Sequence, residues 1–170
     1  MIRTVSVLVL LSSLAFANPF GTGNKSIGIT VGSGSVSYGT TGLITTTYVE
    51  NYFIVGVNAD YFVFENLAVG LGYRGWFGGT PTINQGTVPV TYYIPTNSKF
   101  RPYAGAFYRY TYIADGAYDN YSSAGGRLGM AILFRNGYAG FGWAHEVYLD
   151  DNSRSNNSSG YPEAVIGLSF

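Results

Sequence analysis

The stretch FIVGVNADYFV, residues 53–63, alternates apolar side chains with small or polar ones through its middle. The odd positions are apolar, whereas Gly56, Asn58 and Asp60 occupy even positions. A period of two places the two sets on opposite faces of a β-strand. The stretch LAVGLGYR at 67–74 repeats the alternation after a connector short enough for a hairpin. Together the two stretches predict a pair of antiparallel strands.

The same pattern recurs along the chain and predicts eight strands, at residues 26–38, 52–64, 67–77, 87–95, 102–113, 124–134, 138–149 and 161–170. Short connectors (65–66, 96–101 and 135–137) alternate with long ones (39–51, 78–86, 114–123 and 150–160). The Asn-Gly pair at 136–137 tolerates the positive φ of a tight hairpin turn. An even number of strands with alternating connectors is typical of a membrane barrel. We therefore predict an all-β fold, an eight-stranded antiparallel up-and-down transmembrane β-barrel.

The two faces of each strand indicate which one meets lipid. One face carries many glycines and isolated charges, so we expect it to be the confined interior. The apolar face would then contact hydrocarbon, and a closed sheet would leave no backbone group unpaired there. Aromatic residues near strand ends fit the interfacial girdles of such barrels, and we assign to them Tyr61, Tyr73, Trp76, Tyr108, Tyr112, Trp143 and Tyr148.

The composition of the 170 residues excludes several classes of protein. Only 11% of residues are charged, against about 25% in an average soluble domain. The net charge of zero argues against a nucleic-acid partner, because phosphate binding needs a dense basic face. Without cysteine, the chain has no disulfide, thiolate metal site or cysteine nucleophile, and one histidine offers little for zinc. We therefore expect no metal and no cofactor.

The amino terminus has the three regions of a secretory signal peptide. Arg3 precedes an apolar run at residues 5–11, and Ala15 and Ala17 form a small-residue cleavage pattern. We predict cleavage after Ala17, which leaves a barrel domain at 18–170. The alternative, a membrane anchor or a buried first helix, is disfavoured because spanning a bilayer takes about 20 apolar residues.

Three stretches make the chain resemble the small eight-stranded outer-membrane barrels of the OmpA/OmpX type: residues 61–73, 101–108 and the last strand. The resemblance implies export through the periplasm to the bacterial outer membrane, with membrane lipid and lipopolysaccharide as surroundings. It also implies a signal for the barrel-assembly machinery at Ala164, Ile166, Leu168 and Phe170. Two positions depart from the usual signal. An aromatic or aliphatic residue is more usual where Pro162 stands, and a tyrosine is often found where Leu168 stands. We expect no counterpart of the peptidoglycan-binding domain of OmpA.

Six charged residues within strands fall mostly on the predicted inner face: Asp60, Arg74, Arg109, Arg127, Glu146 and Glu163. The interior of an eight-stranded barrel is just wide enough for side chains to fill it. Unpaired charges in such a space are costly. We therefore predict an interior ion-pair network that plugs the barrel. The alternative is that some of these residues lie at the rims and are solvated.

A catalytic role would depend on the single histidine of the chain. His145 is the only candidate base and Glu146 its nearest acid, but neighbouring residues of a strand point to opposite faces. Two residues on, the same-face position holds Val147 rather than a nucleophile. We expect no enzyme and no catalytic residue, with His145 near the outer rim.

The leading hypothesis is a non-enzymatic, monomeric outer-membrane protein with a structural or adhesion-like role, which presents surface ligands with its long loops, above all 150–157. The alternative is a narrow pore or a transport path for small molecules. Eight predicted inner-face glycines support that alternative because they leave volume: Gly56, Gly70, Gly72, Gly105, Gly125, Gly129, Gly140 and Gly142. A third possibility is a secreted soluble β-barrel or sandwich.

Overall fold

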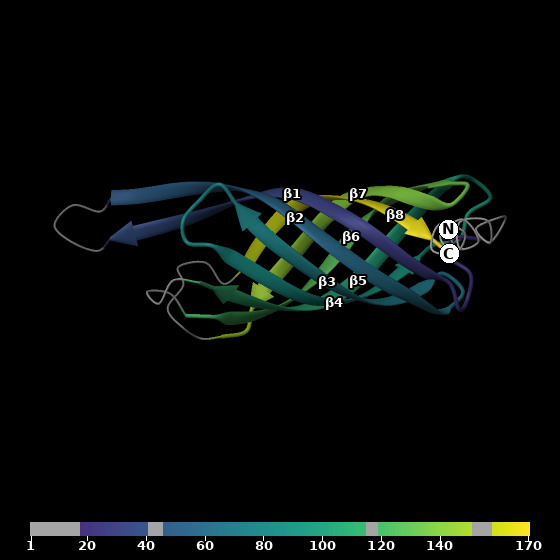
Figure 1. Cartoon of the computed structure of the whole chain (residues 1–170), viewed down its shortest axis with the longest axis horizontal. Coiled ribbons are helices and arrows are strands. Elements are labelled where there is room, and N and C mark those ends of the chain that lie inside the picture. Colours follow the sequence, from purple (N-terminus) through teal and green to yellow (C-terminus); the bar gives the residue numbers. More distant parts are fainter. Residues whose placement is uncertain (1–17, 41–45, 115–118, 151–157) are drawn as a thin grey trace, which may run out of the picture.

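The computed structural model of the chain describes residues 18–40, 46–114, 119–150 and 158–170. Eight antiparallel strands close into one barrel in sequence order (Figure 1). The strands are β1 (Lys25–Thr40), β2 (Thr46–Phe64), β3 (Leu67–Phe77), β4 (Ile83–Tyr93), β5 (Phe100–Ile113), β6 (Tyr121–Phe134), β7 (Gly137–Tyr148) and β8 (Ser158–Ser169). The predicted fold class is confirmed.

The two ends of the barrel differ in their connectors. One end, here called the turn end, carries the connectors 65–66, 94–99 and 135–136 together with the carboxyl terminus (right side of Figure 1). The opposite end, the loop end, carries 41–45, 78–82, 114–120 and 149–157. The loops are shorter than the sequence suggests, because several strands extend into them.

The starts of β2 and β4 are where the predicted boundaries are most wrong. β2 begins at Thr46 rather than at residue 52, and β4 spans Ile83–Tyr93 rather than 87–95. Residues 46–51 and 83–86 are rich in Thr, Asn and Gly, which read as loop formers in the sequence. Pairing with β1 and with β3 and β5 overrides that preference. The starts of β6 and β8 lie three residues before the predicted ones. Both ends of β3 are as predicted, and every other end lies within two residues of its prediction, within the usual scatter.

The turn between β6 and β7 does not use the backbone freedom expected of its Asn-Gly pair. Among the described non-glycine residues only Asn66, in the turn between β2 and β3, has a positive φ, of 64°, and Gly137 is absent from the positive-φ glycines. Gly137 instead lies at the start of β7, where a Cβ would stand 2.1 Å from the carbonyl oxygen of Gly167. The glycine is therefore needed for close approach of β7 and β8.

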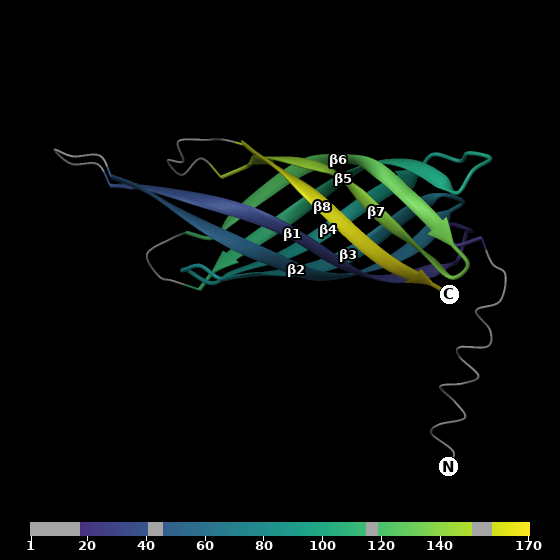
Figure 2. The ribbon, with the colours of Figure 1, turned by 90° about the horizontal axis from the view of Figure 1, so that it is seen from above.

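The first hairpin is longer than the barrel. β1 and β2 pair from Lys25↔Tyr61 to Thr40↔Thr46. The ladder of β1 with β8 ends at Gly32↔Glu163, and that of β2 with β3 ends at Phe53↔Phe77. Residues 33–40 and 46–52 therefore form a two-stranded ribbon, here called the β1–β2 ribbon, which projects beyond the other strands at the loop end in both views (Figures 1 and 2).

The barrel is turned inside out relative to a soluble one. Large apolar side chains lie exposed on its outer face, including Ile29, Val57 and Leu71 at 55–68% exposure. Within the described strand residues, Lys25 is the one charged side chain on this face. The described part of the chain contains no helix that is long and apolar enough to span a membrane.

Candidate functional site

The strands direct all six of the charged residues singled out in the sequence toward the barrel interior. Arg74, Arg109, Glu146 and Glu163 are buried, and Asp60 and Arg127 are partly buried. Each has the parity of the small or polar face of its strand, which alternates with the exposed apolar face. Side chains from six different strands thus meet in one confined volume, here called the charged layer.

Arg109 and Glu146 form the tightest ion pair of the charged layer. Nη1 of Arg109 lies 2.7 Å from Oε2 of Glu146, and the two side chains are 1% and 4% exposed. Nε of Arg109 donates to Oγ1 of Thr87 at 3.0 Å, and Oγ of Ser123 donates to Oε2 of Glu146 at 3.0 Å. The guanidinium also lies 4.6 Å from the ring centroid of Phe107. These contacts satisfy a buried pair that would otherwise pay a large desolvation cost.

Glu163 lies between two arginines. Its Oε2 accepts a hydrogen bond from Nη2 of Arg74 at 3.2 Å, and its Oε1 lies 3.6 Å from Nη1 of Arg127. Arg127 also donates through Nη2 to Oγ1 of Thr91. One carboxylate therefore holds guanidinium groups from β3 and β6.

Tyr161, which the sequence analysis did not single out, joins the two ion-paired groups. Its Oη accepts hydrogen bonds from Nη1 of Arg109 and from Nη1 of Arg74, the latter at 3.5 Å. Tyr161 is 7% exposed and shares the inner face of β8 with Glu163. Its parity could have revealed this position, but aromatic residues were assigned to girdles by default.

Asp60 is the member of the six that the structure leaves outside an ion pair. No cation of the described residues lies within 4.0 Å of its carboxylate, which accepts hydrogen bonds from Asn58 Nδ2 at 2.8 Å and Ser26 Oγ at 3.3 Å. Asp60 lines an interior cavity of about 30 Å³, room for about two water molecules. Other residues that line this cavity include Thr30, Asn58, Arg74, Arg127 and Glu163.

Most of the inner-face glycines make room for these side chains rather than for an open channel. A Cβ at Gly56 would lie 2.6 Å from Cγ of Arg74, and one at Gly70 would lie 2.0 Å from Oδ1 of Asp60. The pattern continues at Gly105, Gly125, Gly129, Gly140 and Gly142, where an added Cβ would come within 3.3 Å of Arg127, Phe107, Tyr103, Val165 or Tyr103 respectively. Gly72 is the exception, since its nearest neighbour would be 3.7 Å away.

An apolar layer, here called the loop-end cap, lies inside the loop end of the barrel against strands β2–β5. Ile54, Trp76, Ile83 and Ile113 occupy one continuous row of the β2–β5 ladders and point inward, and Tyr52 packs edge-on against Trp76 at 5.5 Å. Nε1 of Trp76 donates to Oε1 of Gln85 at 3.0 Å, inside the barrel.

Two of the predicted girdle residues are therefore wrong. Trp76 belongs to the loop-end cap, and Tyr148 lies on the inner-face parity of β7, edge-on to Tyr121 at 5.2 Å. Both residues lie near strand ends, as girdle residues do, but they have the parity of the inner face. The other five, Tyr61, Tyr73, Tyr108, Tyr112 and Trp143, are exposed on the outer face.

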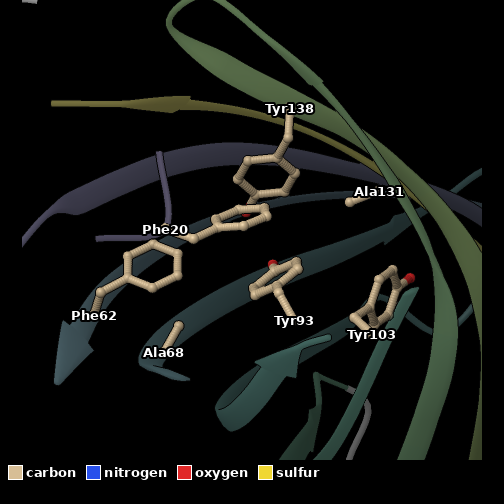
Figure 3. Packing of buried hydrophobic residues seen from close by; sticks show 7 residues of the cluster. All are labelled: Phe20, Phe62, Ala68, Tyr93, Tyr103, Ala131 and Tyr138. Carbon is tan, nitrogen blue, oxygen red and sulfur yellow. The ribbon is translucent and has the colours of Figure 1, made fainter. Parts of the chain in front are cut away.

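Aromatic rings fill the interior at the turn end. This turn-end cluster consists of Phe20, Phe62, Ala68, Tyr93, Tyr103, Ala131 and Tyr138, all at most 5% exposed (Figure 3). Phe20 stacks on Tyr93 with 4.0 Å between the ring centroids, and Tyr138 packs against both rings. The glycines and charges of the inner strand face predict a polar interior, and they give no sign of this aromatic layer.

Comparison with known proteins relates this architecture to a class of membrane proteins. No family model and no curated protein matches the chain. Among solved structures, the chain is similar to the amino-terminal β-barrel domain of Pseudomonas aeruginosa OprF, with a TM-score of 0.66 and 16% identity over 88% of this chain and 99% of that one. It is also similar to Neisserial surface protein A, with a TM-score of 0.62 and 16% identity over 88% and 98% of the two chains. Similarity to Ail of Yersinia pestis gives a TM-score of 0.50 and 12% identity over 88% and 99%.

The chain has the fold of an eight-stranded outer-membrane β-barrel. The exposed apolar belt and the closed ladder agree with the outer-membrane location that the sequence predicts. In this barrel the four residues of the proposed assembly signal, Ala164, Ile166, Leu168 and Phe170, are all exposed on the outer face of the last strand and its final residue.

The candidate catalytic pair is separated by the wall of the outer-membrane barrel. His145 is exposed on the outer face of β7, whereas Glu146 is 3% exposed inside. The described residues contain no group of three or more His, Cys, Asp or Glu side chains placed to hold a metal ion. The predicted cleavage residues Ala15 and Ala17, and the loop segment 151–157, lie outside the described residues.

Proposed function

We propose that this protein is a non-enzymatic, monomeric component of the bacterial outer membrane whose barrel is a sealed scaffold that presents its loop end to the cell surroundings. The observation that carries the proposal is the filling of the interior from one end to the other. The turn-end cluster, the charged layer and the loop-end cap succeed one another along the barrel axis. With the interior filled, contact with other molecules is left to the rims and the outer face.

The β1–β2 ribbon is the element best placed for such contact. It projects beyond the other strands and carries residues 33–40 and 46–52. Along these residues Glu50 is the one charged residue, and Ser, Thr, Gly and Tyr predominate. Strands with free edges and few charges readily pair or pack with other molecules. In an outer-membrane barrel the loop end faces outward, so we infer that a surface ligand binds here and at the neighbouring loops.

The surroundings of the barrel follow from its outer face. Between Lys25 and the loop end, the outer face is an apolar belt without charged side chains in the described strands, which suits membrane hydrocarbon. We propose that lipopolysaccharide surrounds the part of the belt in the outer leaflet. Lys25 lies at the turn end, which we place in the periplasm. We also propose that the barrel-assembly machinery reads the outer-facing residues of β8.

The alternative, a narrow pore or transport path, loses most of its support inside the barrel. It depends on glycines that leave free volume, but most of that volume is taken by Arg74, Asp60, Phe107 and Tyr103. The cavity of about 30 Å³ reaches Tyr93, Tyr103 and Tyr138 of the turn-end cluster, but no residue of the loop-end cap lines it, so it stops short of the loop end. If a transport path did exist, a larger side chain at Gly72 would be expected to block it, so this position can be used to test the alternative.

The ribbon provides the test of the proposed function. Residues 36–50 are replaced by Asn-Gly, a two-residue hairpin turn that keeps the pairing of Ser35 with Asn51 in register. We expect this variant to reach the outer membrane, to show the heat-modifiable gel migration of a folded barrel and to lose binding to host cells or matrix in a cell-binding assay.

A matched control shortens the turn-end connector 94–99, which faces the opposite side of the membrane and should leave binding unchanged. Unchanged binding after shortening all four loop-end connectors together would contradict the proposal. A lipid deacylase or acyltransferase activity that disappears in His145→Ala would contradict its non-enzymatic part.

A further inference from the structure

The segment before β1, residues 18–24, crosses the turn end of the barrel and inserts one aromatic ring into it. Phe20 is 0% exposed although it belongs to no strand. Its ring lies 4.0 Å from that of Tyr93, at 20°, and 5.4 Å from those of Phe62 and Tyr138 (Figure 3). One of the most buried rings of this cluster is thus supplied by a segment outside the barrel wall.

Backbone hydrogen bonds hold the segment against a single turn of the barrel. The Asn66 N–H donates to the carbonyl oxygen of Phe20 at 2.8 Å, and the Gly23 N–H donates to that of Phe62 at 2.8 Å. The Phe62 N–H donates to the carbonyl oxygen of Asn24 at 2.9 Å. Asn66 lies in the turn between β2 and β3, and Phe62 lies near the end of β2. All three bonds can break without loss of a strand, because the β1–β2 ladder begins only at Lys25↔Tyr61.

We propose that residues 18–24 are a plug that seals the turn end, and that the turn-end cluster is a pocket for the ring of Phe20, from which the plug withdraws while the eight strands stay paired. The pocket has an aromatic floor and walls, made by Phe62, Tyr93 and Tyr138. The plug therefore depends on one buried ring and a few backbone contacts, which are features of a locally opening unit.

The plug controls how far water reaches from the periplasmic side. Ala131 lies in the same cluster as Phe20, whereas Ala144 packs with Phe107 and Tyr161 beside the charged layer. Both alanines are 0% exposed. Withdrawal of Phe20 would open a path to Ala131, while the ion pairs and Phe107 would still cover Ala144. The inference is independent of what the loop end binds.

The chain contains no cysteine, so single reporter cysteines can test the plug directly. Ala131→Cys and Ala144→Cys are made in the full chain, each with and without Phe20→Ala, and the barrels are purified from outer membranes. The measurement is the rate of modification by a charged, water-soluble methanethiosulfonate reagent. We expect Phe20→Ala to raise the rate at residue 131 by about tenfold or more and to leave the rate at residue 144 within about twofold.

Phe64→Ala is the matched control, because Phe64 is a phenylalanine at the same end but is 68% exposed on the outer face. It should change neither rate. Phe20→Leu keeps most of the apolar volume and should give a smaller rise at residue 131. Equal rises at residues 131 and 144 would mean general loosening of the barrel and would overturn the proposal. An unchanged rate at residue 131 would overturn it as well. So would failure of Phe20→Ala to form a heat-modifiable barrel, because a plug that withdraws leaves the strands paired.

Discussion

Tyr161 accepts hydrogen bonds from two arginines that belong to different ion pairs, Arg109 with Glu146 and Arg74 with Glu163. The phenol oxygen thus connects β8 to β3 and β5 through buried contacts. Removal of one partner from a buried hydrogen bond exposes the full desolvation penalty of the group left behind. At the scale of single residues, the interior therefore depends on a hydroxyl as well as on its charges.

We predict that Tyr161→Phe destabilises the barrel, because two guanidinium groups lose an acceptor while the ring still fills its space. The expected loss is about 1–3 kcal/mol in the free energy of unfolding, measured by urea titration in lipid vesicles. Tyr73→Phe is the control, since its hydroxyl donates to Asn84 Oδ1 on the exposed outer face. If both variants unfold at the same urea concentration, Tyr161 does not connect the ion pairs energetically.

The outer face of the last strand carries the residues of the predicted assembly signal. Ile166 and Leu168 of β8, and Phe170 just after it, project from the outer face with exposures of 51–62%. Phe170 pairs with Lys25 through backbone atoms alone, at 2.9 Å in both directions. Its side chain therefore adds little packing within the barrel, although its terminal position matches an assembly signal.

We predict that Phe170→Ala lowers the amount of barrel in the outer membrane of cells several-fold. The urea midpoint of the refolded protein in vesicles should remain unchanged, because the ring makes no interior contact. Immunoblots of membrane fractions measure the first quantity. Phe134→Ala, which removes another exposed turn-end phenylalanine, serves as control. Equal losses in both variants would show that exposed aromatic area, rather than the terminal position, matters to assembly.

The whole molecule is an apolar-coated tube whose contents are layered. Ion pairs occupy the middle, and apolar side chains close both ends. The ion-paired side chains of the middle layer are buried, and electrostatic interactions are stronger in such a low-dielectric interior than in water. The arrangement explains how the barrel can place inside most of the charged residues that lie within its strands.

We predict that the purified protein gives no steady single-channel current in planar lipid bilayers, because no continuous aqueous path crosses the three layers. A general porin reconstituted in the same way is the positive control. Steady current that disappears in Gly72→Phe would contradict the sealed barrel and would favour the pore, since a Cβ at residue 72 would make only ordinary van der Waals contacts, the nearest at 3.7 Å.

Alternation along 53–63 and the spacing of turns determined the fold class and the number of strands, because a closed sheet imposes the same two-residue period on every strand. Parity also placed Arg74, Arg109 and Glu146 on the inner face. Sequence alone could not pair them, since pairing depends on the register and tilt that bring separate strands together across the interior. The tertiary structure decided that Tyr161 joins the ion pairs, that Trp76 points inward and that Phe20 fills the turn end. These contacts join residues that are far apart in the chain, so no local sequence pattern predicts them.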